Sequence, residues 1–113
     1  MDCLFCKIIQ GDIPSSKIYE DEFVYAFRDI DPKAPTHVLI VPKKHISSVN
    51  DLETGDAVLL GKVYEAVKHI AVSEGIDKTG YRVVVNTLSD GGQTVAHVHF
   101  HLLGGRSLTW PPG

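Results

Sequence analysis

The chain has 113 residues, of which 43% are hydrophobic and 22% charged, and its formal net charge is −3. These values are typical of one globular domain spanning residues 1–113, and a slightly acidic chain with no basic run argues against a nucleic-acid partner. Its apolar runs are too short to span a bilayer, and its charged N-terminal segment lacks the apolar core of a signal peptide. We therefore expect a cytoplasmic protein with no membrane partner.

The first half of the chain predicts a short helix followed by strands. Apolar residues at helical spacing in residues 3–11, with Gly11 as the stop signal, predict the helix. Residues 17–30 contain β-forming residues around an acidic turn, which predicts two strands. After a loop rich in turn residues, a continuous apolar run from residue 37 predicts a third strand that ends at Pro42.

The second half predicts one long helix and two more strands. Residues 47–75 form a long amphipathic pattern that Gly75 would cap. Residues 80–86 predict a strand, residues 87–94 a loop, and residues 96–105 a final strand. Because helices and strands alternate poorly and several connections have hairpin lengths, we predict an α+β fold with an antiparallel sheet.

The last predicted strand, AHVHFHLLGG, carries a histidine at every second position. Successive side chains of a strand point to opposite faces, so its apolar residues would face the core. The three histidines, His97, His99 and His101, would share the other face. Such a face usually carries Thr, Lys or Glu, and a cluster of three titratable side chains indicates a functional site rather than a purely structural one.

The three histidines cannot all bind one metal ion. His97 and His101 are about 13 Å apart along a regular strand, at roughly 3.3 Å per residue, whereas zinc–nitrogen bonds are about 2.0–2.1 Å long. At most two of the three therefore share an ion. A neutral imidazole is also a competent nucleophile and proton carrier near pH 7, so catalysis is the stronger hypothesis.

The segment SDGGQT, residues 89–94, precedes the histidines and has the composition of a phosphate-binding turn. Gly91 and Gly92 allow the backbone to approach a ligand closely, and successive N–H groups in such turns bind anions. Gln93 adds an amide and Thr94 a hydroxyl, while Asn86 ends the preceding strand. An ordinary hairpin loop is the alternative. Beside the histidines, the segment leads us to hypothesise that His99 attacks phosphorus.

Cys3 and Cys6 form a C-x-x-C motif near the N-terminus. Two reduced thiols, a redox pair and half of a zinc site are all compatible with this spacing. A redox pair is disfavoured because no strand of a βαβ unit precedes the motif. A zinc site requires two further ligands from elsewhere in the chain.

The stretch HVHFHLL resembles the signature of the histidine triad (HIT) superfamily, in its Hint-like branch of nucleotide-binding proteins. The resemblance also covers LFCKIIQGDIP, FRDIDPKAPTHVLIVPKKHI, NTLSDGGQTVAHVHFHLLGGR and WPPG. The resemblance implies a five-stranded antiparallel sheet with two helices, and a homodimer with a continuous ten-stranded sheet. It also implies hydrolysis of purine nucleoside phosphoramidates and adenylates at the α-phosphorus through a nucleotidyl-histidine intermediate, with no cofactor in the chemistry. The alternative is a purine nucleotide-binding regulatory module whose turnover is incidental.

The resemblance also implies roles for individual residues. His99 would be the nucleophile, His97 and His101 would position it and stabilise phosphate charge with His37 nearby, and Thr94 would lie near the leaving group in place of the family's usual serine. The expected nucleotide contacts are Asn86, Gly92, Gln93, Thr94, Val95, His99 and His101 for the phosphate, Asp29 for the ribose, and Leu4, Phe5, Ile8, Ile13, Phe27, Ile30 and Arg28 around the purine. At each apolar position, plain core packing is an equal alternative, and for Arg28 an exposed cation is an equal alternative to a place over the base edge.

For the cysteines, the resemblance extends to the zinc-containing uridylyltransferase branch of the superfamily. By this analogy the ligands would be Cys3, Cys6, His45 and His97. Four nitrogen and sulfur ligands would make a closed, structural zinc site. This set uses only one histidine of the triad, in agreement with the limit of reach on a strand.

Overall fold

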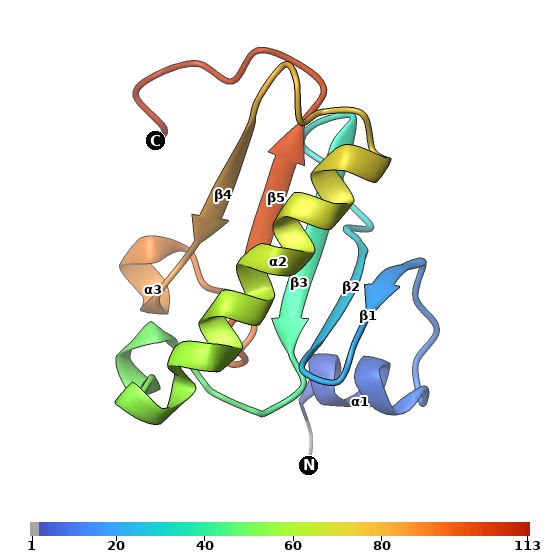
Figure 1. Ribbon diagram of the computed structural model, residues 1–113. Coiled ribbons are helices and arrows are strands. Elements are labelled where there is room, and N and C mark those ends of the chain that lie inside the picture. Colours follow the sequence, from blue (N-terminus) through green and yellow to red (C-terminus); the bar gives the residue numbers. More distant parts are fainter. Residues whose placement is uncertain (1–2) are drawn as a thin grey trace.

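Five antiparallel strands form the centre of the structure, a computed structural model that describes residues 3–113. They are β1 (Lys17–Glu20), β2 (Val24–Arg28), β3 (Thr36–Pro42), β4 (Tyr81–Val85) and β5 (Phe100–Gly104). Their order in the sheet is β1-β2-β3-β5-β4, and every neighbouring pair is antiparallel (Figure 1). The predicted α+β fold with a five-stranded antiparallel sheet is confirmed.

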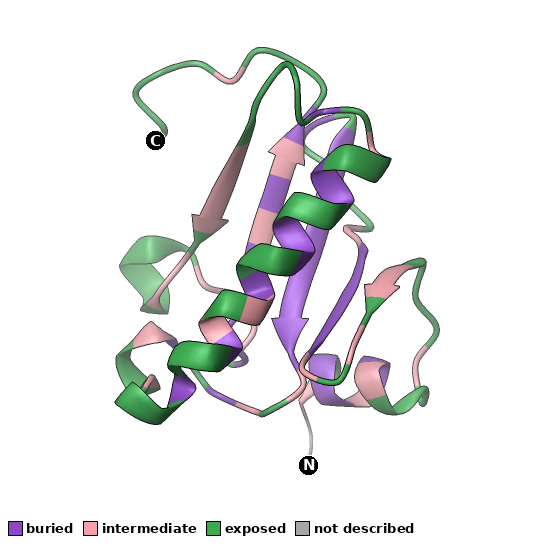
Figure 2. Ribbon diagram, in the orientation of Figure 1, coloured by how far each residue is buried: buried purple, intermediate pink, exposed green. Residues whose placement is uncertain are grey.

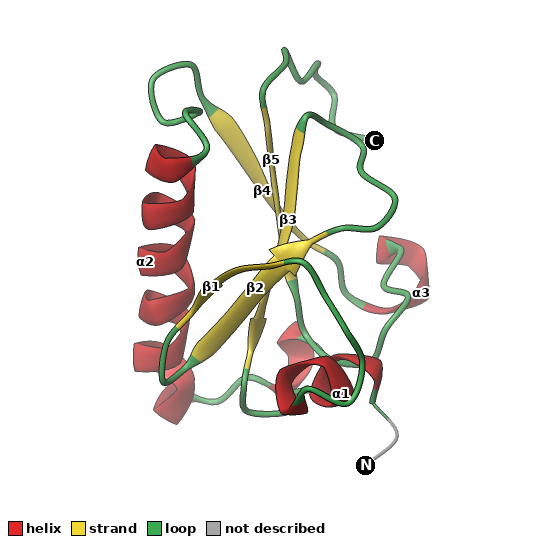
Figure 3. Cartoon of the chain, turned by 90° about the vertical axis from the view of Figure 1, so that its right-hand side faces the viewer, coloured by secondary structure: helices red, strands yellow, loops and turns green. Residues whose placement is uncertain are grey.

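Helices cover both faces of this sheet. Helix α2 (Ala57–Ser73) lies along one face, whereas α1 (Leu4–Gln10) and the four-residue α3 (Leu88–Gly91) lie on the other side (Figure 3). The inner side of α2 is buried and its outer side exposed (Figure 2). In residues 3–113, no helix is both long and apolar enough to cross a membrane.

The two faces of the sheet bury separate apolar clusters. The side chains of the last strand are divided between these faces as their alternation in the sequence predicts. Val98, Phe100 and Leu102 pack with α2 in the larger cluster. Phe5 and Ile8 of α1 pack against the opposite face in the smaller one. Burying these side chains excludes water from both faces and leaves the triad histidines on the α1 side of the sheet.

Strand β5 begins later than predicted, at Phe100 rather than near residue 96. The register that pairs Ile40 with Phe100 would place Pro42 opposite Val98. Proline has no N–H group to donate to the ladder. The N–H of Val98 instead donates to the carbonyl of Ile46, at 2.7 Å. His97 and His99 consequently precede the regular strand, and His101 lies within it.

Two other predicted elements differ from the structure. The long helix begins at Ala57 instead of near residue 47, because the preceding residues form two short 3-10 turns, Val49–Asp51 and Thr54–Asp56. Ser48 caps the first turn, and Glu53 and Asp56 form a capping box around the second. Residues 87–94, predicted as a loop, contain α3.

Candidate active site

The ring of His97 is held by a backbone carbonyl. His97 is completely buried, and its Nε2 lies 2.8 Å from the carbonyl oxygen of Pro42. Because a carbonyl oxygen only accepts hydrogen bonds, Nε2 carries the hydrogen and Nδ1 keeps a lone pair. Burial also lowers the pKa of His97, which favours this neutral ring.

The ring of His99 is fixed in the opposite tautomer. Its Nδ1 donates to the carbonyl oxygen of His97 at 2.8 Å. The lone pair of His99 is therefore on Nε2, the nitrogen available for nucleophilic attack. The side chain is 5% exposed, and the edge-on ring of Phe5, with its centroid 5.0 Å away, restrains the imidazole further.

His101 and His37 form a hydrogen-bonded pair of imidazoles. The backbone N–H of Lys33 donates to Nδ1 of His37 at 3.0 Å, so Nε2 of His37 carries the hydrogen. That Nε2 lies 2.9 Å from Nδ1 of His101 and 3.4 Å from the Asp29 carboxylate. His101 thus accepts on Nδ1, and its Nε2–H is left to donate to a ligand.

Burial keeps both members of this pair neutral. It lowers the pKa of His37 despite the nearby carboxylate of Asp29. It lowers the pKa of His101 to about 4, and the neighbouring rings of His99 and His37 act in the same direction. The donor atoms of Asp29, His37 and His101 lie within 4.8 Å of one another, a spacing compatible with a metal ion. Hydrogen bonds account for that spacing without one, since Nε2 of His37 is a donor.

An open cleft of about 410 Å³ runs beside His101. Six of the predicted residues line it, namely Asp29, His37, Asn86, Gly92, Thr94 and His101. Thr94 is exposed, so its hydroxyl is accessible to a ligand. The ring of His99 is a neighbour of this lining, since its centroid is 5.1 Å from that of His101. The cleft therefore brings together the predicted ribose contact and four of the seven predicted phosphate contacts, whereas Gln93, Val95 and His99 are not in its lining.

Four lining residues were missed by the sequence analysis: Asp31, Lys33, Val84 and Leu103. A signal existed for Val84, because it is two residues before Asn86 on one strand and so faces the same side. Leu103 pairs with His37 across strands β3 and β5. This register is visible only in the folded sheet.

The loop before the triad is held by Gln93 rather than left free for ligand. Its Oε1 accepts from the N–H of Leu88, while its Nε2 donates to the carbonyls of Ser47 and Val95. Gly92 adopts a φ of 85°, a left-handed conformation that favours glycine. Gln93 therefore shapes the cleft edge, and its predicted contact with the nucleotide requires these bonds to be exchanged.

The residues predicted around the purine divide into two groups. Phe5, Ile8 and Phe27 are buried in the α1-side cluster, and Ile13 packs partly buried against it. Leu4 is 44% exposed and Ile30 fully exposed, so these two side chains are accessible to a ligand. The buried members serve the core and present at most their edges to a base.

The structure does not bring Arg28 to this site. Its guanidinium makes two hydrogen bonds with the carboxylate of Glu74, at 2.8 and 2.9 Å. Glu74 follows the C-terminus of α2, on the face of the sheet opposite Phe27. Adjacent residues of a strand point to opposite faces. The expected contact between Arg28 and the purine edge is therefore corrected to an ion pair with α2.

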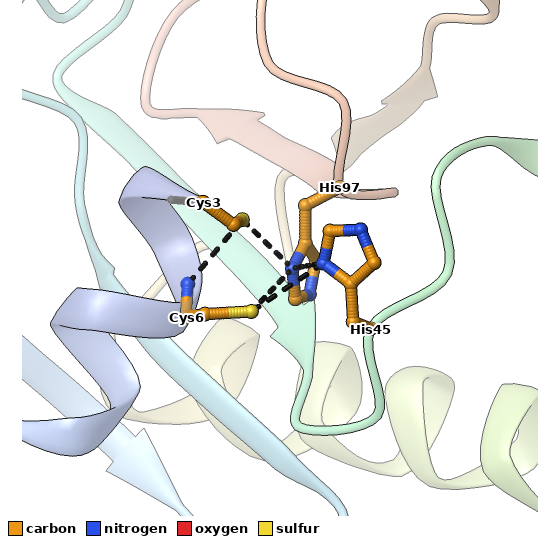
Figure 4. A group of neighbouring side chains, drawn as sticks. All are labelled: Cys3, Cys6, His45 and His97. Atoms are coloured by element: carbon orange, nitrogen blue, oxygen red, sulfur yellow. Dashed lines mark hydrogen bonds between the residues drawn. The ribbon is translucent and has the colours of Figure 1, made fainter. Parts of the chain in front are cut away.

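Cys3, Cys6, His45 and His97 converge on a single point (Figure 4). Their four donor atoms lie within 4.8 Å of one another. Nδ1 of His97 is 3.3 Å from Sγ of Cys3, 3.6 Å from Sγ of Cys6 and 3.1 Å from Nδ1 of His45. This group could hold a metal ion, and it is composed of the four residues named from the resemblance.

Comparison with known proteins agrees with this geometry. The family model of the HIT domain matches residues 10–108, so the chain belongs to the HIT domain family. A protein of Escherichia coli strain K12 named purine nucleoside phosphoramidase is 49% identical over 107 residues, which are 95% of this chain and 90% of that protein. The crystal structure of a HIT family hydrolase from Legionella pneumophila Philadelphia 1 matches with a TM-score of 0.97 and 54% identity, over 99% of this chain and all of that one. A histidine triad protein from Clostridium difficile matches with a TM-score of 0.93 and 48% identity, over 96% and 95% of the two chains.

The depressed pKa of His101 predicts a titration far below the ordinary histidine range. We expect NMR signals of the His101 ring to remain those of a neutral imidazole from pH 8 to pH 5, and to titrate near pH 4. Between about pH 6.5, the ordinary value, and pH 4, the unfolded chain binds a proton that the folded chain does not. The unfolding free energy should therefore fall as the pH falls through this window. A midpoint for His101 at or above about 6.5 would contradict the assignment.

Proposed function

We propose that this enzyme hydrolyses purine nucleoside phosphoramidates and related adenylates at the α-phosphorus, through a nucleotidyl-His99 intermediate. The chain is a nucleotide hydrolase of the HIT family, whose similar members include the phosphoramidase and hydrolase described above. The observation that carries the finer proposal is the bond from Nδ1 of His99 to the carbonyl of His97, which leaves Nε2 as the nucleophile.

The reaction proceeds in two displacements at phosphorus. Nε2 of His99 attacks, the P–N bond breaks, and its electron pair leaves with the amine, which takes a proton from water through the hydroxyl of Thr94. Water then attacks the phosphorus of the nucleotidyl-histidine and gives its proton to solvent. The bond between phosphorus and Nε2 of His99 breaks, and its electron pair returns to Nε2. In both steps the Nε2–H of His101 donates to a phosphate oxygen, where charge develops. Asp29 accepts from the ribose hydroxyls.

Replacing the nucleophile separates catalysis from binding. We expect His99→Ala to lower kcat with an adenosine phosphoramidate by at least about a thousandfold, because no other group forms the covalent intermediate. Binding of AMP, measured by calorimetry, should change only a few-fold, since the cleft lining remains.

A matched control is His69→Ala, which removes an exposed histidine of α2 and should turn over at the wild-type rate. Acid quenching of the wild type should trap a protein-bound nucleotide. Wild-type turnover by His99→Ala would exclude the intermediate, and a wild type that binds AMP without turnover would favour the regulatory module.

We also propose a structural zinc ion held by Cys3, Cys6, His45 and His97. Tetrahedral zinc with ordinary bond lengths places its sulfur and nitrogen ligands about 3.5 Å apart and two nitrogens about 3.3 Å apart. The distances here fit, at 3.3 to 3.6 Å between Sγ and Nδ1 atoms and 3.1 Å between the two Nδ1 atoms. The carbonyl of Pro42 keeps the His97 lone pair on Nδ1, as a ligand requires. The ion would tie α1 to the segment that carries His99.

Metal analysis tests this site. We expect about one equivalent of zinc in protein purified without added metal, because such sites bind tightly enough to survive dialysis. Cys6→Ser should lose the ion, whereas His69→Ala should retain it. Less than about a tenth of an equivalent in the wild type, given that tight binding, would leave Cys3 and Cys6 as plain thiols.

A homodimer is the third part of the proposal. Strand β4 is an edge strand of the sheet, and two of its apolar side chains are exposed beside that edge, Tyr81 at 39% and Val85 at 36%. An unpaired apolar edge favours pairing with another strand. Two-fold pairing of β4 with its copy would give a continuous ten-stranded sheet, and two-fold symmetry is the commonest closed arrangement.

Sedimentation at micromolar concentration should give twice the 12.4 kDa chain mass. Val85→Glu should shift the equilibrium toward monomer, because it places carboxylates on the facing edges. The control, Val72→Glu, changes a residue of α2 that is 64% exposed and far from that edge, and it should remain dimeric. A monomeric wild type would exclude the proposal.

A further inference from the structure

Arg106, in the segment after β5, binds backbone carbonyls instead of a carboxylate. Its Nη2 and Nε donate to the carbonyl oxygen of Lys33 at 2.8 and 3.3 Å, and its Nη1 donates to that of Ser107 at 3.0 Å. Within residues 3–113, none of the ion pairs involves this guanidinium. The positive charge of Arg106 is therefore directed at the loop that contains Lys33, which is 73 residues away in sequence.

The neighbouring Gly105 brings the chain close enough for this contact. Its φ of 93° is a left-handed conformation, and a Cβ at this position would lie 2.9 Å from Cβ of Pro35. The absence of a side chain thus lets residues 105–106 lie directly against residues 33–35. Arg106 and Gly105 together hold the loop that leads into β3.

That loop continues into the catalytic hydrogen bonds. Lys33, whose carbonyl Arg106 binds, donates its own N–H to Nδ1 of His37 at 3.0 Å. His37 then donates from Nε2 to Nδ1 of His101 at 2.9 Å. An unbroken series of contacts therefore runs from the Arg106 guanidinium to the imidazole that faces the cleft.

We propose that Arg106 is a positioning residue for the triad, acting through Lys33 and His37 to fix the tautomer of His101. This inference rests on the proposed function, in which the Nε2–H of His101 donates to phosphate. If the Lys33 loop shifts, His37 loses the N–H donor on its Nδ1, and only the more distant Asp29 carboxylate, 3.4 Å from Nε2, still favours a hydrogen on that nitrogen. His101 can then carry its hydrogen on Nδ1, and a lone pair on Nε2 would face the anionic phosphate.

The test compares Arg106→Gln and Arg106→Lys with a matched control, Arg82→Gln. Within residues 3–113, the hydrogen bonds of the Arg82 guanidinium likewise go to backbone carbonyls, those of Leu108 and Thr109, and none goes to the Lys33 loop. The guanidinium also lies 5.8 Å from the centre of the Trp110 ring. The two arginines line the same neighbouring cavity, so both glutamine variants remove one positive charge from one region. Only the Arg106 variants alter the hold on Lys33.

Two measurements are made on each variant. The first is the nitrogen chemical shifts of the His37 and His101 rings, which report tautomers without any turnover. The second is steady-state hydrolysis of an adenosine phosphoramidate. We expect Arg106→Gln to lose the single Nε2–H tautomer of His101 and to lower kcat about tenfold with KM changed less than about threefold, the pattern of a lost transition-state interaction. Arg106→Lys, which keeps one donor toward Lys33, should lose less, and Arg82→Gln should retain wild-type shifts and rates.

Wild-type shifts in Arg106→Gln, or equal losses in Arg106→Gln and Arg82→Gln, would overturn the positioning role. If Arg106→Gln does not fold, the nitrogen chemical shifts of His37 and His101 in Arg106→Lys decide whether Arg106 has the positioning role. Absence of turnover in the wild type would instead overturn the proposed function, while the tautomer comparison would still decide the role of Arg106.

Discussion

The hydrogen bond from Nε2 of His97 to the carbonyl of Pro42 links the end of strand β3, the cysteine–histidine group and the segment that carries His99. Pro42 has no N–H, so the β3–β5 ladder stops there and its carbonyl is free to accept from a side chain. With its hydrogen on Nε2, the His97 ring presents a lone pair to Cys3, Cys6 and His45. The backbone of the same residue accepts from His99. One proline carbonyl thus orients the His97 ring of the cysteine–histidine group and, through the same residue, the segment that carries His99.

Burial and hydrogen bonding have complementary effects on these rings. Burial disfavours the imidazolium form and so keeps His37, His97 and His101 neutral. A neutral imidazole has one donor and one acceptor, and backbone groups then decide which nitrogen is which. Protein groups that fix both charge and tautomer before the ligand arrives reduce the reorganisation needed during reaction, which is the physical basis of preorganised electrostatic catalysis.

The sequence predicted the strands and the faces of the histidine segment because alternation is a local property. Val98 and Phe100 reach the α2-side core as expected. The long helix was predicted to start too early, because Ser48 and Glu53 begin short capped turns whose geometry periodicity does not reveal. The face of the sheet on which Arg28 lies could have been predicted from the sequence, because its neighbour Phe27 must face the other side. The contact between Arg106 and Lys33 could not be predicted from the sequence, because it depends on the register of β3 with β5.

The same register explains why residues so distant in sequence act on one cleft. Pairing Thr36 with Gly104 places the chain before β3 beside the chain after β5. His37 then lies next to Leu103, and the loop from Asp31 to Pro35 lies against Gly105 and Arg106. The cysteine–histidine group braces the other end of β5, where His97 precedes the strand. The histidines of the triad are thus restrained from both ends of a short central strand, so their geometry depends on backbone contacts more than on the cleft surface itself.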